Sequence, residues 1–368
     1  MISRNTNVMI PSEAVINISS VLASLLKAPL WGLALFTGAK SFIANPLIGS
    51  ERLNRRGLHV WRVKAASRVM RWRMAMLSRG VPAAEREAYL RDGFLLKQDF
   101  LTPEVFAKLR AELESVHEHG PGEVRECCQG DTRTHRVLLD PETLSQLPTA
   151  RQVLAAGQLQ RLLRFCAGHR RLPIVHLEKV FNGARESDEA DPQKSLHVDT
   201  FQPTMKFWLY LDDVSEHNGP FMFVSQSTQL SKGRLDWEYH MSLTAREHAN
   251  RYTQRGSFRV EEGALERFGL NFPTLFKVPA NTLLIADTFG MHGRGPARAG
   301  SSRLALWGMS RTTPFLPLPG LGGEWLNRLQ YRVLKAERAR DDKRAAARGV
   351  ESSWHVVPRE SLREQDMT

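Results

Sequence analysis

The alternation of apolar and polar residues is clearest just after Pro203, where it predicts a β-strand. One face of this strand would carry large or charged side chains, and the other face only apolar ones. The two faces would carry Lys206, Trp208, Tyr210 and Asp212 on one side and Phe207, Leu209 and Leu211 on the other. Asp212, Asp213, Asn218 and Gly219 favour turns, so we expect the strand to end where these residues begin.

Similar patterns elsewhere predict a mainly β protein with a few flanking helices. Short apolar runs predict further strands at residues 93–96, 132–139 and 174–181, and two more on either side of His292. Thr102 and Pro103 supply an N-cap and a first-turn proline, which predict a helix from there to about His117. A second helix is predicted at residues 151–165.

The first 80 residues differ from the rest of the chain. Residues 14–39 are mostly apolar, whereas residues 52–80 are arginine-rich, with apolar residues recurring every three or four positions. Lys27 and Pro29 interrupt the apolar run, so a membrane-spanning helix fits it poorly. We expect a surface-lying or re-entrant hairpin and a basic amphipathic helix, both at an anionic membrane surface. The alternatives are a hydrophobic flap and a helix packed on the domain by the same apolar stripe.

The distribution of charge sets this arm, residues 1–80, apart from the remainder. The chain has 368 residues and a formal net charge of +12. The arm holds 12 Lys and Arg residues against 2 acidic ones, a net charge of +10, so the remainder carries only +2. A nearly neutral body offers no basic groove, and we therefore expect no nucleic-acid partner. We expect a membrane surface as the partner of the arm.

Three regions follow from these patterns. Residues 1–80 are the apolar and basic helical arm, and residues 81–320 are a domain built on the predicted strands. Residues 321–368 form a basic C-terminal helix and a polar tail, the helix being amphipathic with Trp325 and Leu329 on its apolar side.

Cysteine usage indicates the compartment. The three cysteines, Cys127, Cys128 and Cys166, are odd in number and two are adjacent, so they form no recognisable disulfide framework. This fits a reducing compartment, and we expect a cytoplasmic protein at the inner face of the membrane. Cys127, Cys128 and His135 match no zinc-binding spacing, so ordinary thiols are expected there.

Candidate chemistry lies in two separated segments. His197 and Asp199 are two residues apart, so on an extended backbone their side chains point to the same face. They can supply two of the three ligands of a 2-His-1-carboxylate iron site, and His292, in a predicted turn, can supply the third. Arg303 opens the next strand, and its planar guanidinium can bind a carboxylate through two nitrogens.

The order of these motifs resembles the phytanoyl-CoA dioxygenase-like family of iron(II)/2-oxoglutarate oxygenases. That family has H-x-D, a strand ending in L-D-D, then N-G-P, and a distal His followed by Arg after about ten residues. The matching positions here are His197, Asp199, Leu211 to Asp213, Asn218 to Pro220, His292 and Arg303, and the resemblance spans roughly residues 86–314. Where the family often has P-G-S-H, this chain has Ser225, Gln226, Ser227 and Thr228. Because that loop usually lies near the substrate, the substrate is less well defined than the chemistry.

The resemblance implies a double-stranded β-helix, or jelly-roll, core that binds iron(II) through His197, Asp199 and His292. It also implies 2-oxoglutarate as co-substrate with oxygen, oxidation of the substrate and release of succinate. Arg303 would hold the distal carboxylate of 2-oxoglutarate, and Trp208 would be a wall or a donor of the co-substrate pocket, unless it is simply a core aromatic.

Three other arginines compete for the role of Arg303. Arg294 and Arg298 fall in a Gly- and Pro-rich loop, where solvation is the default, and Arg311 lies about 26 Å farther along the strand. Arg303 is therefore the residue we expect. The acid at Asp199 favours hydroxylation or another oxidation, since related halogenases have a small residue at that position.

We therefore expect an iron(II)/2-oxoglutarate-dependent dioxygenase that hydroxylates a lipid or lipid-linked substrate, the lipid being suggested by the arm. Two alternatives remain open. One is an oxygenase of a soluble small molecule, and the other is a jelly-roll protein that binds a ligand or a membrane without turnover.

Overall fold

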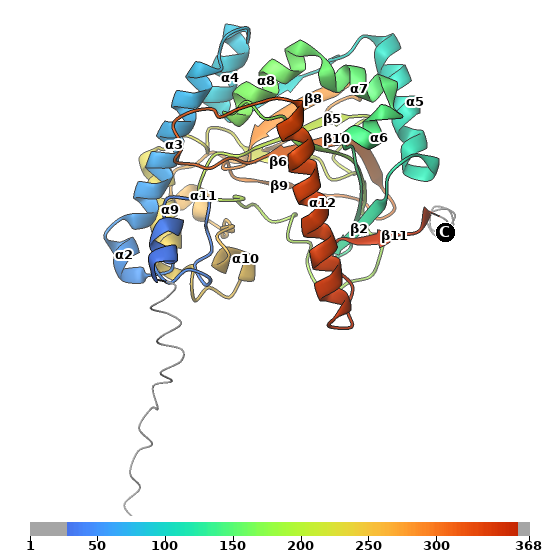
Figure 1. The fold of residues 1–368 in the computed structure, drawn as a ribbon. Coiled ribbons are helices and arrows are strands. Elements are labelled where there is room, and N and C mark those ends of the chain that lie inside the picture. The colour runs from blue at the N-terminus through green and yellow to red at the C-terminus, as the bar shows by residue number, and fades with distance from the viewer. Residues whose placement is uncertain (1–27, 360–368) are drawn as a thin grey trace, which may run out of the picture.

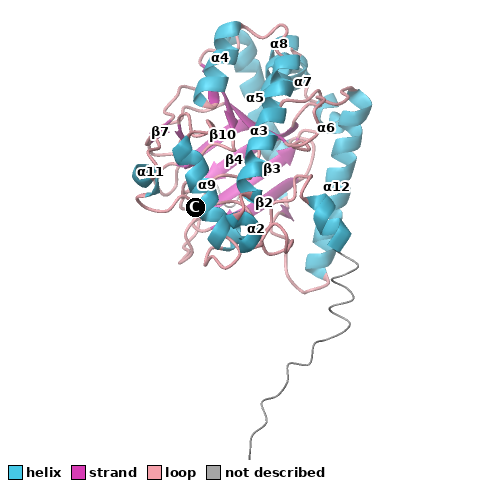
Figure 2. Ribbon diagram, turned by 90° about the vertical axis from the view of Figure 1, so that its left-hand side faces the viewer, coloured by secondary structure: helices cyan, strands magenta, loops and turns pink. Residues whose placement is uncertain are grey.

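The computed structural model describes residues 28–359 and contains two antiparallel sheets with helices around them (Figures 1 and 2). The larger sheet has eight strands in the order β1–β8–β5–β10–β4–β3–β2–β11. Its strands are β1 Phe94–Lys97, β2 Val124–Gln129, β3 Thr132–Leu138, β4 Ile174–Phe181, β5 Met205–Tyr210, β8 Thr282–Asp287, β10 Ser302–Ser310 and β11 His355–Val357. The smaller sheet, in the order β7–β6–β9, consists of β7 Pro273–Leu275, β6 Phe221–Val224 and β9 His292–Arg294.

The helices fall into three groups along the chain. The first group, before β4, consists of α2 Glu51–Arg55, α3 Leu58–Met76, α4 Ala83–Asp92, α5 Pro103–His119, α6 Pro141–Ser145, α7 Pro148–Ala155 and α8 Gly157–Ala167. The second group, between β6 and β7, consists of α9 Lys232–Thr244, α10 Arg251–Gln254 and α11 Ala264–Arg267. The long helix α12, Glu324–Ala346, lies by itself across the front of the molecule in Figure 1.

Side chains of the larger sheet alternate between two cores. On the central strand β5, Phe207 and Leu209 enter the core shared with α4, α5, α7 and α8, whereas Trp208 and Tyr210 enter the core shared with the smaller sheet. Strand β10 follows the same rule, with Leu306 on the helix side and Trp307 on the other side. Because the period is two, every second residue of β5 and β10 faces the space between the sheets.

The strand and helix predictions are largely confirmed. The two facing sheets form the expected jelly-roll core with flanking helices. Strand β4 has the predicted bounds, and α5 begins at Pro103 with the Thr102 hydroxyl as its N-cap. The helix predicted at residues 151–165 is instead two helices, because α7 ends at Ala155 and α8 starts at Gly157.

The described part of the arm packs on the domain. One side of α3 buries Val63 and Ala66 beside Phe201 and Phe289, and Met70 and Met74 enter the main core. This is the alternative in which the apolar stripe packs on the domain. The packing extends to two arginines of the same helix.

Arg62 and Arg73 are almost completely buried on α3. Arg62 donates from Nε to the Leu35 carbonyl at 2.9 Å, and its guanidinium carbon lies 4.0 Å from the centre of the Phe201 ring. Arg73 donates to the Thr312 hydroxyl at 3.1 Å. These arginines tie α3 to neighbouring segments, so they are unavailable to a membrane surface.

Other arm residues remain on the surface. Trp61 is 47% exposed and Trp72 is 60% exposed, and Leu30, Leu33 and Phe36 are also largely exposed. Among residues 28–359, no helix is both long enough and apolar enough to cross a membrane. The first half of the predicted apolar hairpin, residues 14–27, lies outside the described residues.

The C-terminal helix differs from its sequence pattern. The predicted apolar side, with Trp325 and Leu329, is exposed, whereas Tyr331 and Ala345 are buried. The Tyr331 hydroxyl accepts the N–H of Val175 at 3.1 Å, which fastens α12 to the start of β4. The hydrophobic periodicity therefore predicted the helix correctly but not the side by which it packs.

Candidate metal centre

His197 and Asp199 lie in an extended segment held between two other parts of the chain. His197 pairs across isolated antiparallel bridges with His292 on one side and Arg259 on the other. The N–H of His197 donates to the His292 carbonyl at 2.8 Å, and the His292 N–H donates back at 2.9 Å. The N–H of Asp199 donates to the Thr288 carbonyl at 3.0 Å. These backbone bonds bring the two distant motifs together, with His292 as the first residue of β9 rather than within the turn.

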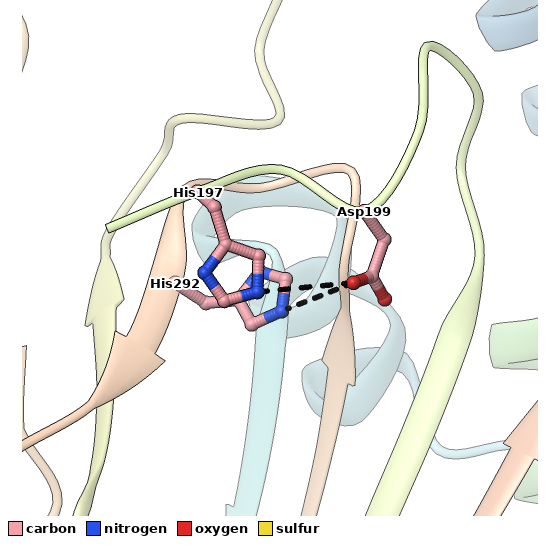
Figure 3. Close-up of side chains that lie close together, drawn as sticks. All are labelled: His197, Asp199 and His292. Atoms are coloured by element: carbon pink, nitrogen blue, oxygen red, sulfur yellow. Dashed lines mark ion pairs between the residues drawn. The ribbon is translucent and has the colours of Figure 1, made fainter. Parts of the chain in front are cut away.

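The three side chains converge on one point (Figure 3). Oδ1 of Asp199 lies 3.9 Å from Nε2 of His197 and 3.8 Å from Nε2 of His292. One ligand atom from each residue lies within 4.8 Å of the other two. The structure therefore brings together all three residues that the sequence proposed as ligands.

Hydrogen bonds to the backbone orient both imidazoles. Nδ1 of His197 lies 2.8 Å from the Ser195 carbonyl oxygen, and Nδ1 of His292 lies 2.9 Å from the Gly290 carbonyl oxygen. A carbonyl oxygen can only accept, so each Nδ1 must carry the proton and each Nε2 keeps a free lone pair. This arrangement of a ring N–H donated to a carbonyl is the usual one for histidines that bind metals.

Burial keeps both imidazoles neutral. It lowers the pKa of His292 to about 4, and burial together with the neighbouring His292 lowers the pKa of His197 well below its usual range. Nε2 of His292 is buried without a hydrogen-bond partner. A buried lone pair of this kind requires an explanation, and a bound metal ion provides one.

Asp199 is held as a carboxylate. Burial opposes its ionisation, but the ammonium group of Lys206 keeps its pKa well below the usual range. Nζ of Lys206 lies 2.7 Å from Oδ2 of Asp199. Two neutral imidazoles and one ionised carboxylate form a donor set that suits iron(II), and the residues present therefore fit this ion.

Arg303 lines the same cavity as the three candidate ligands, which has a volume of about 300 Å³. It faces the space between the sheets from the start of β10, where it pairs with Val180 of β4. Its side chain is only 7% exposed, and Nη1 has no hydrogen-bond partner. A buried guanidinium with a free donor is suited to a carboxylate ligand.

Trp208 also lines this cavity. It lies opposite Trp307 on the paired strand, and its ring centre is 4.8 Å from that of Phe221 in the smaller sheet. Trp208 is therefore both a core aromatic and a wall of the cavity, so the two possibilities raised by the sequence coincide.

The three competing arginines differ in position. Arg294 is not solvated as its loop suggested, because its Nη1 lies 2.9 Å from Oδ2 of the fully buried Asp191 carboxylate. Arg298 is exposed. Arg311 is exposed too, but it lines the cavity at the far end of β10 from Arg303.

Two basic residues beside the candidate metal centre, Lys206 and Lys40, were missed in the sequence. The alternation along β5 already placed Lys206 on the same face as Trp208, which was the available indication. Lys40 carried no such indication, yet its Nζ donates to the Asp199 carbonyl at 2.5 Å. Burial, followed by the charge of Arg311, lowers the pKa of Lys40 to about 8.

The C-terminal region also lines the cavity, which the sequence did not predict. The guanidinium of Arg136 lies 3.8 Å from the centre of the Trp307 ring and 4.5 Å from that of Trp354, so it is stacked between the two. Arg136 also pairs with Glu178 at 2.5 Å. All four residues line the cavity, and Trp354 comes from the segment just before β11.

Solved structures with similar folds include several metal- and 2-oxoglutarate-binding proteins. The epimerase SnoN from nogalamycin biosynthesis, in complex with Fe³⁺ and alpha ketoglutarate, is 17% identical, with a TM-score of 0.42 over 68% of this chain and 93% of that chain. HygX from Streptomyces hygroscopicus, with nickel and 2-oxoglutarate bound, is 15% identical, with a TM-score of 0.39 over 63% and 88%. EctD from S. alaskensis, with bound Fe, is 15% identical, with a TM-score of 0.40 over 62% and 76%.

The family comparison is more direct. A search of curated proteins found no match. The family model for phytanoyl-CoA dioxygenase (PhyH) matches residues 89–263, a range that includes His197 and Asp199 and ends before His292. Residues 89–263 are thus a phytanoyl-CoA dioxygenase (PhyH) domain, and the proteins of that family are iron- and 2-oxoglutarate-dependent oxygenases.

Proposed function

We propose that His197, Asp199 and His292 hold iron(II), that Arg303 binds the distal carboxylate of 2-oxoglutarate, and that the chain hydroxylates a substrate in the cavity. The observation that carries this proposal is the combination of two free Nε2 lone pairs, one carboxylate and one buried guanidinium with a free Nη1 donor around a single cavity. When bound, iron(II) and 2-oxoglutarate supply the oxidation of the substrate by oxygen, coupled to the conversion of 2-oxoglutarate into succinate.

The residues of this chain have separate tasks in that reaction. The carbonyls of Ser195 and Gly290 keep the imidazole protons on Nδ1, so both rings remain ligands. Arg303 would orient 2-oxoglutarate from the opposite sheet, and a buried ion pair of this kind is geometrically selective. Trp208 and Phe221 form an apolar wall beside the ligands, which limits the access of water.

The experiment is a coupled measurement on the purified full chain. Iron(II), ascorbate and 2-oxoglutarate are added in air, and succinate is quantified with and without each component. We expect succinate formation that requires iron and disappears in the His197→Ala variant. A protein that binds iron and 2-oxoglutarate but forms no succinate with any candidate substrate would instead be a ligand-binding jelly roll.

The proposal of a lipid or lipid-linked substrate is supported by one feature of the described arm. Trp61, Trp72, Leu30, Leu33 and Phe36 present apolar surface to solvent, as a membrane-contacting region would. The lining of the cavity is not that of a hydrocarbon tunnel, because it includes several arginines. Any lipid would therefore enter by its polar group.

A further inference from the structure

The cavity contains more positive charge than its carboxylates can balance. Two acids line it, Glu178 and Asp199, whereas the basic residues that line it are Arg136, Lys206, Arg294, Arg303 and Arg311. A cleft whose lining has one predominant sign attracts ligands of the opposite sign. The ligands of this cavity should therefore be anions.

Three of the five basic residues are already paired. Arg136 pairs with Glu178 at 2.5 Å and Lys206 with Asp199 at 2.7 Å. Arg294 pairs with Asp191, as described above. Within residues 28–359, neither Arg303 nor Arg311 forms an ion pair with a carboxylate. The cavity thus has two arginines available for oxyanions from outside the protein.

The two available arginines are too far apart to share one ligand. Arg303 is the second residue of β10, and Arg311 follows its last residue. Eight residues of extended chain separate their Cα atoms by about 26 Å. Side chains stand roughly perpendicular to a strand, so the two guanidinium groups remain farther apart than the length of 2-oxoglutarate. A co-substrate held by Arg303 therefore leaves Arg311 without a partner.

Other cationic groups lie near Arg311. Lys206 pairs with Met309 near the end of β10, and Lys40 is close enough to Arg311, Lys206 and Arg259 for the charge of each to lower its pKa. Lys40 and Lys206 both contact Asp199, one at its carbonyl and the other at its carboxylate. Arg259 pairs with His197 across an antiparallel bridge, and paired residues of that kind present their side chains on the same face. Its guanidinium is buried, and Nε and Nη1 have no hydrogen-bond partner.

We propose that Lys40, Lys206, Arg259 and Arg311 form a second oxyanion site, which binds a carboxylate or phosphate group of the primary substrate. This assignment rests on the proposed function, because it takes Arg303 to be occupied by 2-oxoglutarate. Since Lys206 touches Asp199, an oxyanion on Lys206 lies next to the metal ligands. The oxidised carbon is then only a few bonds away from the anionic group.

The test measures binding and needs no turnover. The full chain is loaded with nickel(II), which keeps the site redox-inert, and with saturating 2-oxoglutarate. Inorganic phosphate is then titrated while the fluorescence of the cavity tryptophans or the heat of binding is recorded. We expect saturable binding of phosphate in the presence of 2-oxoglutarate, and about tenfold or greater weakening in Arg311→Gln.

Two matched variants give the controls. Arg332→Gln removes an exposed arginine on α12 and should bind phosphate like the wild type. Arg303→Gln should lose affinity for 2-oxoglutarate while Arg311→Gln retains it. Phosphate binding that is absent in the wild type, unchanged in Arg311→Gln, or abolished by 2-oxoglutarate would overturn the second site. A failure of iron binding or of succinate formation would overturn only the proposed function.

A comparison of three probes distinguishes a lipid headgroup from a soluble anion as the source of the oxyanion. Short-chain soluble phosphatidic acid is compared with inorganic phosphate and with acetate under the same conditions. Much tighter binding of phosphatidic acid, lost in Arg311→Gln, indicates a lipid headgroup. Equal or tighter binding of the small anions, also lost in Arg311→Gln, indicates a soluble acid or phosphate ester.

Discussion

Lys206 contacts only one of the two carboxylate oxygens of Asp199. Nζ of Lys206 lies 2.7 Å from Oδ2, which leaves Oδ1 as the oxygen that faces Nε2 of His197 and His292. An oxygen already engaged by an ammonium group is the poorer metal ligand, so we expect a metal to bind the other oxygen. The arrangement therefore predicts monodentate binding of iron by Asp199 and assigns Lys206 the role of a positioning residue.

The variant Lys206→Met tests this role. Without its partner, the Asp199 carboxylate is free to rotate, and loss of such an outer contact typically lowers metal affinity by about 10–100-fold. We expect weaker iron binding with a normal thermal unfolding transition, measured by competition with a chelator. If Lys206→Met and the wild type bind iron equally, Lys206 does not position the carboxylate.

Removing a ligand should have a larger effect. His292→Ala leaves two candidate ligands, so we expect stoichiometric iron binding to be lost, whereas the backbone bonds to His197 remain and the chain still folds. Metal content after gel filtration and circular dichroism measure the two outcomes. The matched control is His119→Ala, which removes an exposed histidine at the end of α5 and should retain iron.

Arg303→Ala removes the proposed partner of the distal carboxylate of 2-oxoglutarate. A desolvated charge pair typically contributes about 2–5 kcal/mol, so the concentration of 2-oxoglutarate needed for half-maximal succinate formation should rise at least about 30-fold. Iron binding should not change. Arg298→Ala, an exposed arginine nearby, serves as the control. An unchanged requirement in Arg303→Ala would transfer the role to Arg294 or Arg311.

The buried Asp287 at the end of β8 predicts a dependence of stability on pH. Burial raises its pKa to about 6, although its Oδ1 accepts the N–H groups of Thr204 and Phe289, each at 3.0 Å. Because the folded protein holds this proton more tightly than the unfolded chain, stability falls as pH rises from about 4 to about 6. The loss is complete above that window.

Asp287→Asn should remove this loss, because an amide oxygen accepts the same two hydrogen bonds without a charge. We expect the variant to be more stable than the wild type by roughly 1–3 kcal/mol at pH 7.5, and to show little difference near pH 4. Urea unfolding at the two pH values measures this. A variant less stable than the wild type at pH 7.5 would mean that the ionised carboxylate is itself stabilising.

The arm predicts membrane binding with two components. Its net charge of +10 should give a salt-sensitive part, and its apolar residues a salt-resistant part. The sharper test is deletion of residues 1–27, since deleting all of residues 1–80 would also remove the core residues of α3. We expect the full chain to float with anionic vesicles and the truncated chain to float less while retaining succinate formation. A full chain that never floats would contradict the membrane prediction.

Much of the fold could be predicted because the relevant pattern is local. The alternation along β5 correctly assigned the two faces of Trp208 and Leu209, and Thr102 with Pro103 marked the start of α5. Short edge strands such as β7 and β11 have three residues each and carry no usable periodicity. The burial of Arg62 could not be predicted from the sequence either, because it depends on hydrogen bonds to carbonyl groups of residues 35–39.

The candidate ligands could be predicted because they occur in a recognisable order of short motifs. His197, Asp199 and His292 keep their spacing and strand contexts, and the structure brings them within reach of one metal ion. Lys40 could not be predicted, because it reaches the centre from 159 residues away along the chain. The availability of Arg311 could not be predicted either, since only the complete set of ion pairs reveals which arginines lack a partner.

The stacking of Arg136 between Trp307 and Trp354 affects the order in which a newly made chain matures. The ribosome completes all three candidate ligands and Arg303 before it reaches Trp354. We therefore expect that iron can enter the cavity during synthesis, while the cavity is still open on one side. Docking of β11 beside β2 would then add the last wall, so that metal loading precedes substrate selection in the life of each molecule.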